Sequence, residues 1–209
     1  MRVKTPVRGY HHGDLKVALV DAVEQVVRER GLGHVSLRAV ARQVGVTHAA
    51  SAHHFENKAG LLTAFATQGY LQLAEAVLVA IEEAQPLDGP SVLEAVGQGY
   101  VRFALANPGR FEVMFRLDLL NADDPGFVAA SDGAFSLLVS TVARCQSEGF
   151  LGRHDPEVVA VSAWSMVHGL AALWISGRLG ERIREKDPNR LAGKVSRLYV
   201  DSVLRGIGP

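Results

Sequence analysis

The sequence nearly lacks cysteine, and that absence limits how the fold can be stabilised. Cys145 is the single cysteine among 209 residues, so the chain cannot form an internal disulfide. A chain without disulfides suits a reducing cytoplasm, which is the expected location. A lone free cysteine usually behaves as a small buried apolar residue, and we therefore assign Cys145 no redox role.

Long apolar runs are also missing. No segment approaches the ~20 consecutive uncharged apolar residues that a membrane-spanning helix requires. The N-terminus is basic, but no apolar run follows it closely enough to form a signal peptide. We therefore expect a protein without membrane contact.

Motifs of the common enzyme classes are absent as well. The sequence has no glycine-rich phosphate loop, no zinc-type spacing and no recognisable nucleophile–base pair. The histidines of His11-His12 and His53-His54 are adjacent, and adjacent side chains on a helix point about 100° apart, so neither pair readily closes on one ion. We expect no catalytic residue, no metal and no cofactor. The alternative is an enzyme built on a helical bundle, which a stoichiometric cofactor spectrum of the purified protein would support.

The sequence has no net charge, but its charges are unevenly distributed. Residues 1–60 contain nine Lys and Arg against five Asp and Glu, and the rest of the chain carries the opposite excess. Six of the eight histidines lie in the same basic part. A basic segment joined to an acidic body indicates a polyanion partner for the first part only. Chance variation of surface charge explains so small a difference equally well.

The sequence does contain clear signals for helices. Apolar residues recur at helical spacing from Leu15 to Val27, and capping residues mark the later starts. Starts are predicted at Ser36, Thr47, Asn57, a Ser91–Glu94 capping box, Asn107-Pro108, Asp124-Pro125, Asp155-Pro156 and Asp187-Pro188. The helix after Asn57 should run to Pro86, and the one from Pro108 to about residue 118. No alternating strand pattern occurs, so the expected fold class is all-α with about nine helices.

One short segment has the pattern of a helix-turn-helix. Ser36 is a suitable cap for a short helix, and Gly45 just after that helix can adopt the left-handed conformation that a tight turn requires. Thr47 can then cap a second short helix, whose start would face a major groove. An ordinary αα-hairpin of a helical bundle fits the same pattern.

Several motifs resemble those of TetR-type transcriptional regulators, in that family's order and spacing. In the N-terminal part they are Tyr10-His11-His12-Gly13-Asp14-Leu15, Ser36-Leu37-Arg38-Ala39-Val40-Ala41, Gly45-Val46-Thr47 and His54-Phe55-Glu56-Asn57-Lys58-Ala59-Gly60-Leu61-Leu62. Farther on, Trp164-Ser165-Met166-Val167-His168-Gly169 resembles the Trp-x-x-x-His-Gly signature of one class of TetR C-terminal domains. The resemblance implies a helix-turn-helix DNA-binding domain at 10–58 and a helical ligand-binding and dimerisation domain at 59–209.

The resemblance also implies which residues contact DNA. The positions where family members touch the duplex hold Arg38, Thr47, His48, Ser51, His53, His54 and Lys58. Lys58 begins a helix, so its charge and the helix dipole both favour a phosphate. One position departs from the family, because Ala52 stands where a backbone-contacting tyrosine is usual. The basic arm with Arg2, Lys4 and Arg8 either adds DNA contacts or is an untethered tail.

The candidate ligand-binding residues lie in the C-terminal part. They are Phe103, Phe111, Met114, Phe115, Trp164 and His168. Trp164 and His168 are four residues apart on one helix, so both can line a cavity or pack in a core. We favour packing for this pair, because aromatic residues at helical spacing usually form a core.

The last two predicted helices carry apolar stripes that are wider than packing within a single chain requires. By the resemblance, the helices near 156–176 and 188–204 form the four-helix seam of a homodimer. The expected function is a ligand-responsive transcriptional repressor that binds a palindromic double-stranded DNA operator and is released by a small-molecule effector. The alternative is a constitutive or protein-gated regulator without such a ligand. A thermal-shift screen separates the two, since a ligand at 100 times its Kd adds about 2.7 kcal/mol of stability.

Overall fold

The computed structural model describes residues 12–152 and 154–205, and the basic arm with Arg2, Lys4 and Arg8 lies outside them. All regular elements in these residues are helices, which confirms the predicted all-α fold class. They are α1 (His12–Arg30), η1 (Leu32–His34), α2 (Leu37–Val44), α3 (His48–His54), α4 (Lys58–Glu83), α5 (Gly89–Ala106), α6 (Pro108–Met114), η2 (Leu117–Leu119), α7 (Pro125–Ser147), α8 (Pro156–Ile175) and α9 (Pro188–Arg205).

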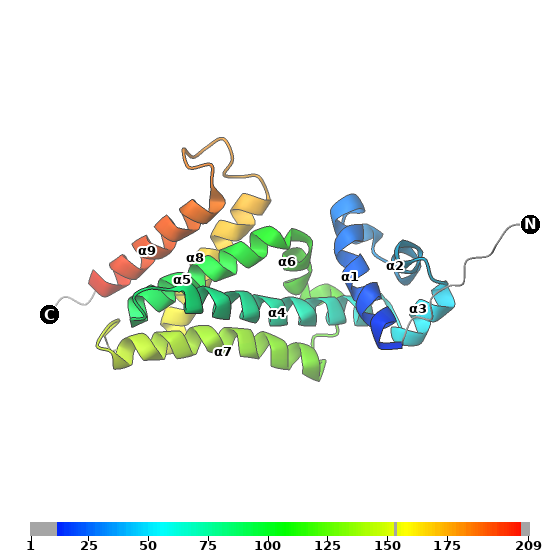
Figure 1. The fold of residues 1–209 in the computed structure, drawn as a ribbon, viewed down its shortest axis with the longest axis horizontal. Helices are drawn as coiled ribbons and strands as arrows, with labels where there is room; N and C mark the ends of the chain where they lie inside the picture. The colour runs from blue at the N-terminus through cyan, green and yellow to red at the C-terminus, as the bar shows by residue number, and fades with distance from the viewer. Residues whose placement is uncertain (1–11, 153, 206–209) are drawn as a thin grey trace, which may run out of the picture.

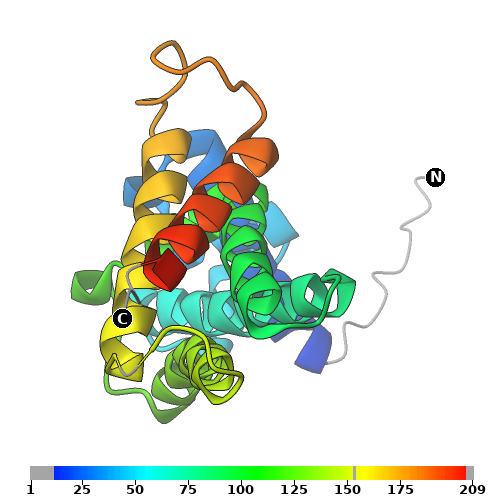
Figure 2. The same cartoon turned by 90° about the vertical axis from the view of Figure 1, so that its left-hand side faces the viewer.

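The helices form a small head and a larger body that share one long helix. Helices α1, α2 and α3 make the head, and α5 to α9 surround the distal part of α4 in the body (Figure 1). Helix α4 begins in the head beside α1 and continues through the body between α5 and α7. Seen from the far end of the body, α8 and α9 lie together on one side of it (Figure 2). A displacement of α4 in the body would therefore also displace the part of α4 that lies in the head.

Side-chain caps determine most of the helix starts as predicted. Ser36 accepts a hydrogen bond from the Ala39 amide at 3.1 Å, and Thr47 accepts one from the Ala50 amide at 3.2 Å. The same type of cap starts the helices after Asn57, Asp124, Asp155 and Asp187. Each cap satisfies a backbone amide that has no partner within its helix.

Two predicted helix boundaries are wrong. Helix α5 is capped by Asp88, which accepts from the Ser91 amide at 2.8 Å, so Ser91 lies inside the first turn and its capping box with Glu94 does not form. Asp88, two residues before Pro90, supplies the cap three residues earlier than predicted, because proline is tolerated in the first turn. Helix α6 ends at Met114 rather than near residue 118, and the short 3-10 turn of η2 follows it.

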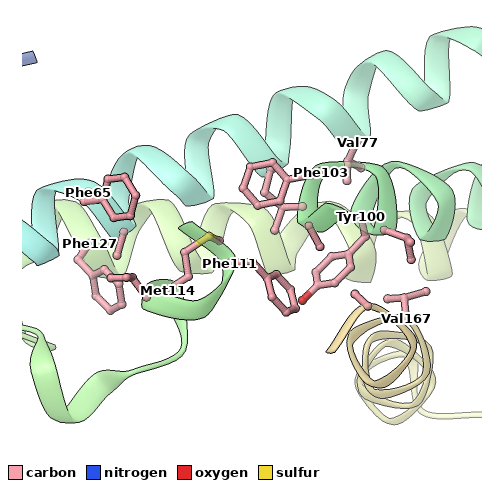
Figure 3. Close-up of a cluster of buried hydrophobic side chains, with 14 of the residues drawn as sticks. Phe65, Val77, Tyr100, Phe103, Phe111, Met114, Phe127 and Val167 are labelled. Atoms are coloured by element: carbon pink, nitrogen blue, oxygen red, sulfur yellow. The ribbon is translucent and has the colours of Figure 1, made fainter. Parts of the chain in front are cut away.

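The core of the body forms where α4, α5, α6 and α7 meet. Figure 3 shows Phe65 of α4 and Phe127 of α7 at one end of the cluster, and Tyr100 with Val167 at the other. Phe65 and Met114 have no exposed surface, and Phe103 is almost fully buried. Packing of these side chains fixes the angle at which α6 crosses α4.

Helix α5 crosses α4 closely at Gly99. A Cβ atom added at Gly99 would lie 2.9 Å from the Ala80 Cβ and 3.0 Å from the Ala76 carbonyl oxygen. Backbone atoms cannot move aside cheaply, so Gly99→Ala is expected to lower the free energy of unfolding by about 1–3 kcal/mol despite its higher helix propensity. Urea denaturation measures the change.

The matched control for this prediction is another helical glycine. Nothing lies within 4 Å of a Cβ built at Gly133 on α7. Gly133→Ala is therefore expected to raise stability by about 0.5–1 kcal/mol, because alanine restricts the unfolded chain and favours the helix. Equal effects of the two substitutions would contradict the close α4–α5 crossing.

Helices α4, α7 and α8 are long and apolar enough, by length and composition, to cross a membrane. This corrects the expectation that no segment approaches that composition. In the described structure α4 packs on α5 and α7, and α8 packs on α5, so each of these helices has protein neighbours on part of its surface. The three helices therefore establish no membrane location.

Candidate DNA-binding surface and ligand cavity

Helices α2 and α3 are joined by a tight turn that has the geometry of a helix-turn-helix. Gly45 ends α2 in the left-handed region at φ 79°, and the Val46 amide donates to the Ala41 carbonyl at 2.9 Å. A residue with a Cβ would be strained at this φ, which explains the glycine. Ala41 is buried where the two helices meet, and its small side chain lets them approach. The turn directs α3 outward from the head (Figure 1).

The outward face of α3 is short and chemically simple. His48, Ala49, Ala52 and His53 are exposed, and their spacing places them on one side of the helix. Thr47, just before the helix, is exposed as well, and Arg38 is exposed on α2. Small side chains between two imidazoles allow the helix backbone to approach a flat or grooved partner closely. Ala52 offers this face only a methyl group.

Ser51 corrects one predicted DNA contact. Its side chain has no exposed surface, and its hydroxyl lies 2.8 Å from the His48 carbonyl and 3.3 Å from the Leu37 carbonyl of α2. The residue therefore points into the head rather than outward, because α3 presents its opposite face to solvent. Its role in this structure is to join α3 to the start of α2.

His54 and Lys58 lie at the edge of the candidate surface. His54 is half-buried, and its ring meets that of His53 edge-on with centroids 5.6 Å apart. Lys58 is half-buried at the first position of α4, and its Nζ donates to the Leu32 carbonyl at 3.4 Å. One ammonium hydrogen is thereby used within the head, and two remain for another acceptor.

A buried arginine of α6 joins the body to the head. Arg110 is only 4% exposed, and its Nη1 donates to the Phe65 carbonyl at 3.0 Å and to Gln68 Oε1 at 3.1 Å, both on α4. Its Nη2 lies 3.9 Å from Asp21 Oδ1 of α1, and its guanidinium stacks 4.0 Å from the Phe65 ring centroid. The planar fork allows one side chain to hold both partner helices. Arg110 thus links α6 directly to α1 and α4.

The body encloses a cavity of about 420 Å³. Its wall is mostly apolar and comes from α4, α5, α7, α8 and α9, with additional residues next to α6 and η2. The aromatic lining residues are Tyr70, Tyr100, Phe115, Phe127, Phe135, Trp164 and Tyr199. A cavity of this size and polarity is typical of sites for small organic molecules, which span roughly 300–1,000 Å³.

The predicted ligand-binding residues divide between the cavity wall and the core. Phe115 and Trp164 line the cavity. Phe103, Phe111 and Met114 are buried and are absent from its lining, so their packing role is the one the structure supports. His168 is absent from the lining as well, and its ring packs against those of Phe111 and Phe115 with centroids 5.0 and 4.6 Å away.

Two polar side chains of the cavity wall, Tyr100 and Trp164, are linked with His168 by hydrogen bonds. Trp164 Nε1 lies 3.2 Å from the Tyr100 hydroxyl, which lies 2.9 Å from His168 Nδ1. Indole can only donate, so the Tyr100 oxygen accepts and its own hydrogen goes to a neutral His168. Burial lowers the pKa of His168 and raises that of Tyr100, so both are neutral near pH 7.

Two further tyrosine hydroxyls at the wall are bonded to carbonyls. Tyr70 donates to the Met114 carbonyl at the end of α6 (3.3 Å), and burial raises the pKa of Tyr70 to about 12. Tyr199 of α9 donates to the Val159 carbonyl of α8 at 3.0 Å. The Tyr70 contact connects the cavity wall to the helix that carries Arg110.

Sequence reasoning missed the tyrosines and the two serines, Ser131 and Ser196, that line the cavity. Tyr70, Tyr100 and Tyr199 lie on three helices far apart in the sequence, and no motif links them. Ser196 carried a usable signal, because it lies between Ala192 and Val200 on the apolar side of α9 at a spacing of four.

Helices α8 and α9 also present apolar side chains to solvent. On α8 these are Val158, Val161, Leu173 and Ile175, and on α9 the most exposed is Leu198. Ser162 and Ser165 lie beside them on the exposed side of α8 and would let another helix approach closely. The two helices contact each other and lie on the same side of the body (Figure 2). This part of the described surface has the composition of a contact face between proteins.

Two family models match most of the chain. The model for bacterial regulatory proteins of the tetR family matches residues 19–70, which cover most of the head and the first part of α4. The model for the C-terminal domain of tetracyclin repressor-like proteins matches residues 93–195, within the body.

Individual proteins show the same similarity. The HTH-type transcriptional regulator YobS of Bacillus subtilis, itself uncharacterized, is 23% identical over 155 residues, which are 74% of this chain and 76% of YobS. A solved structure of a Rhodococcus sp. RHA1 protein of unknown function is 30% identical with a TM-score of 0.80, covering 97% of this chain and all of that one. A tetR-family regulatory protein from Rhodococcus RHA1 is 20% identical with a TM-score of 0.70, covering 92% and 96% of the two chains.

Proposed function

This chain belongs to the TetR family of bacterial regulatory proteins, and from that premise we propose that it is a ligand-responsive repressor that binds a palindromic operator as a homodimer. The ligand-responsive part of the proposal is supported by one observation, the cavity in the body. The wall of this cavity is hydrogen-bonded to α6, the helix that contacts the head. The cavity favours an effector over the alternative of constitutive regulation.

In this proposal α3 lies in the major groove of double-stranded DNA. His48 and His53 face the base edges, and Ala49 and Ala52 let the helix backbone approach. Arg38, Thr47, His54 and Lys58 hold phosphates around the groove. Ser51 supports the helix from inside instead of touching DNA. The DNA-binding domain is residues 10–58 and the effector and dimerisation domain residues 59–209.

A homodimer through α8 and α9 explains the exposed apolar side chains of those helices. Such a contact is isologous, so the two heads are related by a two-fold axis, as the half-sites of a palindrome are. Binding of the second head is then intramolecular, which raises the affinity of the dimer far above that of one head. The expected location of this complex is the cytoplasm.

The proposed switch runs from the cavity to the head through α6. A molecule that presses on Tyr70 and Phe115 changes the position of Met114 and of α6. Arg110 transfers that change to Asp21 of α1 and to α4, which alters the distance between the two heads. The effector acts only by its different affinity for the two head spacings. A small-molecule effector that left operator affinity unchanged would exclude this mechanism.

The decisive experiment maps which intergenic DNA the purified protein protects. A two-fold symmetric protected site is the expected result, since two related heads read one duplex. Gel-shift titrations with that site then give the affinity against which effectors and variants are compared. Protection without sequence preference would contradict the proposal.

Lys58→Ala is expected to weaken binding to every DNA sequence by a similar factor. A lysine that contacts phosphate carries no sequence information, and its loss should reduce the slope of log affinity against log salt by about 1. Titrations of the operator and of an unrelated duplex at several salt concentrations measure both effects. Arg102→Ala on α5, whose side chain pairs with Glu83 at the surface of the body, is the charge-matched control and should change neither. A loss confined to the operator would contradict the phosphate role of Lys58.

A further inference from the structure

We propose that the cavity takes an organic cation, a small molecule with a largely apolar body and one amine or quaternary ammonium group. The apolar body lies among the helices, and the positive charge lies at the mouth of the cavity between Asp132 and the ring of Phe135. The proposal rests on the proposed function only in taking the cavity as the effector site, and it adds the chemical class of that effector.

The mouth of the cavity lies beside η2 and the first half of α7. Four lining residues are exposed, and these are Leu117 of η2, Ala122, and Val128 and Asp132 of α7. The lining residues of α4, α5, α8 and α9 are buried or half-buried. The exposed end of a bound molecule is therefore next to this half of α7.

Asp132 supplies an unpaired negative charge at this mouth. It is the one acid among the described lining residues, which include no Lys, Arg or His. Within the part of the chain that the structure describes, its carboxylate forms no ion pair. The two bases nearest to it in the sequence are taken, since Arg116 pairs with Asp118 and Arg144 with Glu148, each at 2.8 Å. A positive group brought by a ligand would be the first cationic partner of this carboxylate.

Aromatic rings beside Asp132 supply a second attraction that also depends on positive charge. Phe135 follows Asp132 by three residues on α7, so the two side chains are neighbours on one face of the helix. The Phe135 ring centroid is 5.9 Å from that of Trp164, which is 6.2 Å from that of Phe115. All three rings line the cavity and are half-buried. A cation within about 6 Å of such a ring is attracted by its negative face, and a neutral group of the same size is not.

The hydroxyls of the wall give a neutral polar ligand no comparable site. Tyr70 and Tyr199 are bonded to carbonyls, and Tyr100 is bonded to both Trp164 and His168. A neutral ligand would have to break one of these bonds in order to use a tyrosine hydroxyl. An ammonium group at Asp132 breaks none of them, so it adds to the gain from burying the apolar body.

The chain around the mouth carries further negative charge. Residues 116–132, which include all four exposed lining residues, contain four aspartates and one arginine. A field of this sign raises the local concentration of cations and lowers that of anions. The field therefore favours entry of the same class of molecule that Asp132 and Phe135 favour once it is bound.

Three naphthalene probes test the proposal, because they share one apolar body and differ in charge at pH 7. Naphthylmethylamine is cationic, naphthylmethanol is neutral and naphthoate is anionic. Calorimetric titration is expected to show the amine binding roughly 3- to 30-fold more tightly than the alcohol, the combined effect of one exposed ion pair and one cation–π contact. Naphthoate should bind most weakly, because its charge meets that of Asp132.

Two substitutions at the mouth separate the two attractions. Asp132→Asn removes the charge and keeps the size, so it should weaken amine binding roughly 2- to 5-fold and leave alcohol binding unchanged. Phe135→Leu keeps an apolar side chain without a ring and should weaken amine binding more than alcohol binding. Asp123→Asn is the matched control, because Asp123 is exposed in the same acidic segment but does not line the cavity. Its effect on the amine should be smaller than that of Asp132→Asn.

Several results would overturn the ligand class. These are equal affinities for the amine and the alcohol, tighter binding of naphthoate than of the amine, or no binding of any of the three probes. An amine affinity that Asp132→Asn leaves unchanged would overturn the position of the charge. The Tm of the ligand-free Asp132→Asn protein should equal that of the wild type, because an exposed carboxylate without a partner contributes little to stability.

The operator gel shift distinguishes this proposal from the proposed function. If the amine binds with dependence on Asp132 but does not release the operator, the ligand class stands and the proposed switch fails. If naphthoate or naphthylmethanol releases the operator and the amine does not, the switch stands and the ligand class is wrong. Release by the amine, weakened by Asp132→Asn, supports both.

Discussion

Val161→Asp is expected to make the protein monomeric and to weaken its binding to a two-fold symmetric operator by about 100-fold or more. Val161 lies on the exposed side of α8, where Val158 and Leu173 are also exposed. A carboxylate there would be desolvated in the proposed dimer contact, and the loss of the dimer removes the gain from linking two heads. Sedimentation equilibrium gives the oligomeric state, and gel shifts give the affinity.

Leu78→Asp is the matched control for this substitution. Leu78 and Val161 are both 47% exposed, but Leu78 lies on α4, away from the proposed contact face. The control should therefore keep both the dimer and the operator affinity. A Val161→Asp protein that stays dimeric would place the dimer contact elsewhere. A monomeric variant with undiminished affinity would show that one head suffices.

Arg110→Met is expected to lower the free energy of unfolding by about 3 kcal/mol. Methionine fills much of the same space, but it cannot donate to the Phe65 carbonyl. It also removes the positive charge that interacts with Glu24, whose buried Oε2 has no hydrogen-bond partner. Loss of one member of a buried charged group typically costs 3–5 kcal/mol. Urea denaturation followed by circular dichroism measures the change.

Arg102→Met is the control, because Arg102 pairs with Glu83 at the surface of the body. An exposed ion pair contributes little to stability, so the control should unfold close to the wild type. Arg110→Lys separates charge from geometry. Lysine keeps the charge but cannot bond Phe65 and Gln68 with a planar fork, so an intermediate loss is expected. Wild-type stability of Arg110→Met would contradict the joining role of Arg110.

Helix starts could be predicted because their causes are local. Ser36, Thr47 and Asn57 each bond an amide three residues ahead, so a few consecutive residues contain the whole interaction. The α5 start was misplaced because two caps compete there, and the sequence does not show that Asp88 rather than Ser91 reaches a free amide.

The candidate sites were harder to predict because they depend on how helices are rotated about their axes. Helix α3 has seven residues, which is too short for an apolar periodicity to fix its inward side, so Ser51 was placed outward by its polar side chain and its motif position. The cavity depends on gaps between α4, α5, α7, α8 and α9, which no single segment encodes. Trp164 and His168 share a helix face, yet only Trp164 reaches the cavity.

The inward anchoring of α3 by Ser51 separates its folding role from its recognition role. The Ser51 hydroxyl bonds and the buried ring of Phe55 fix the helix from inside the head. The side chains of His48, Ala49 and Ala52 are exposed on the opposite side of the helix, and His48 takes part in the anchoring through its backbone carbonyl alone. Substitutions of these three side chains are therefore expected to be tolerated by the fold, so the DNA preference can diverge during evolution while the scaffold and its cavity stay the same.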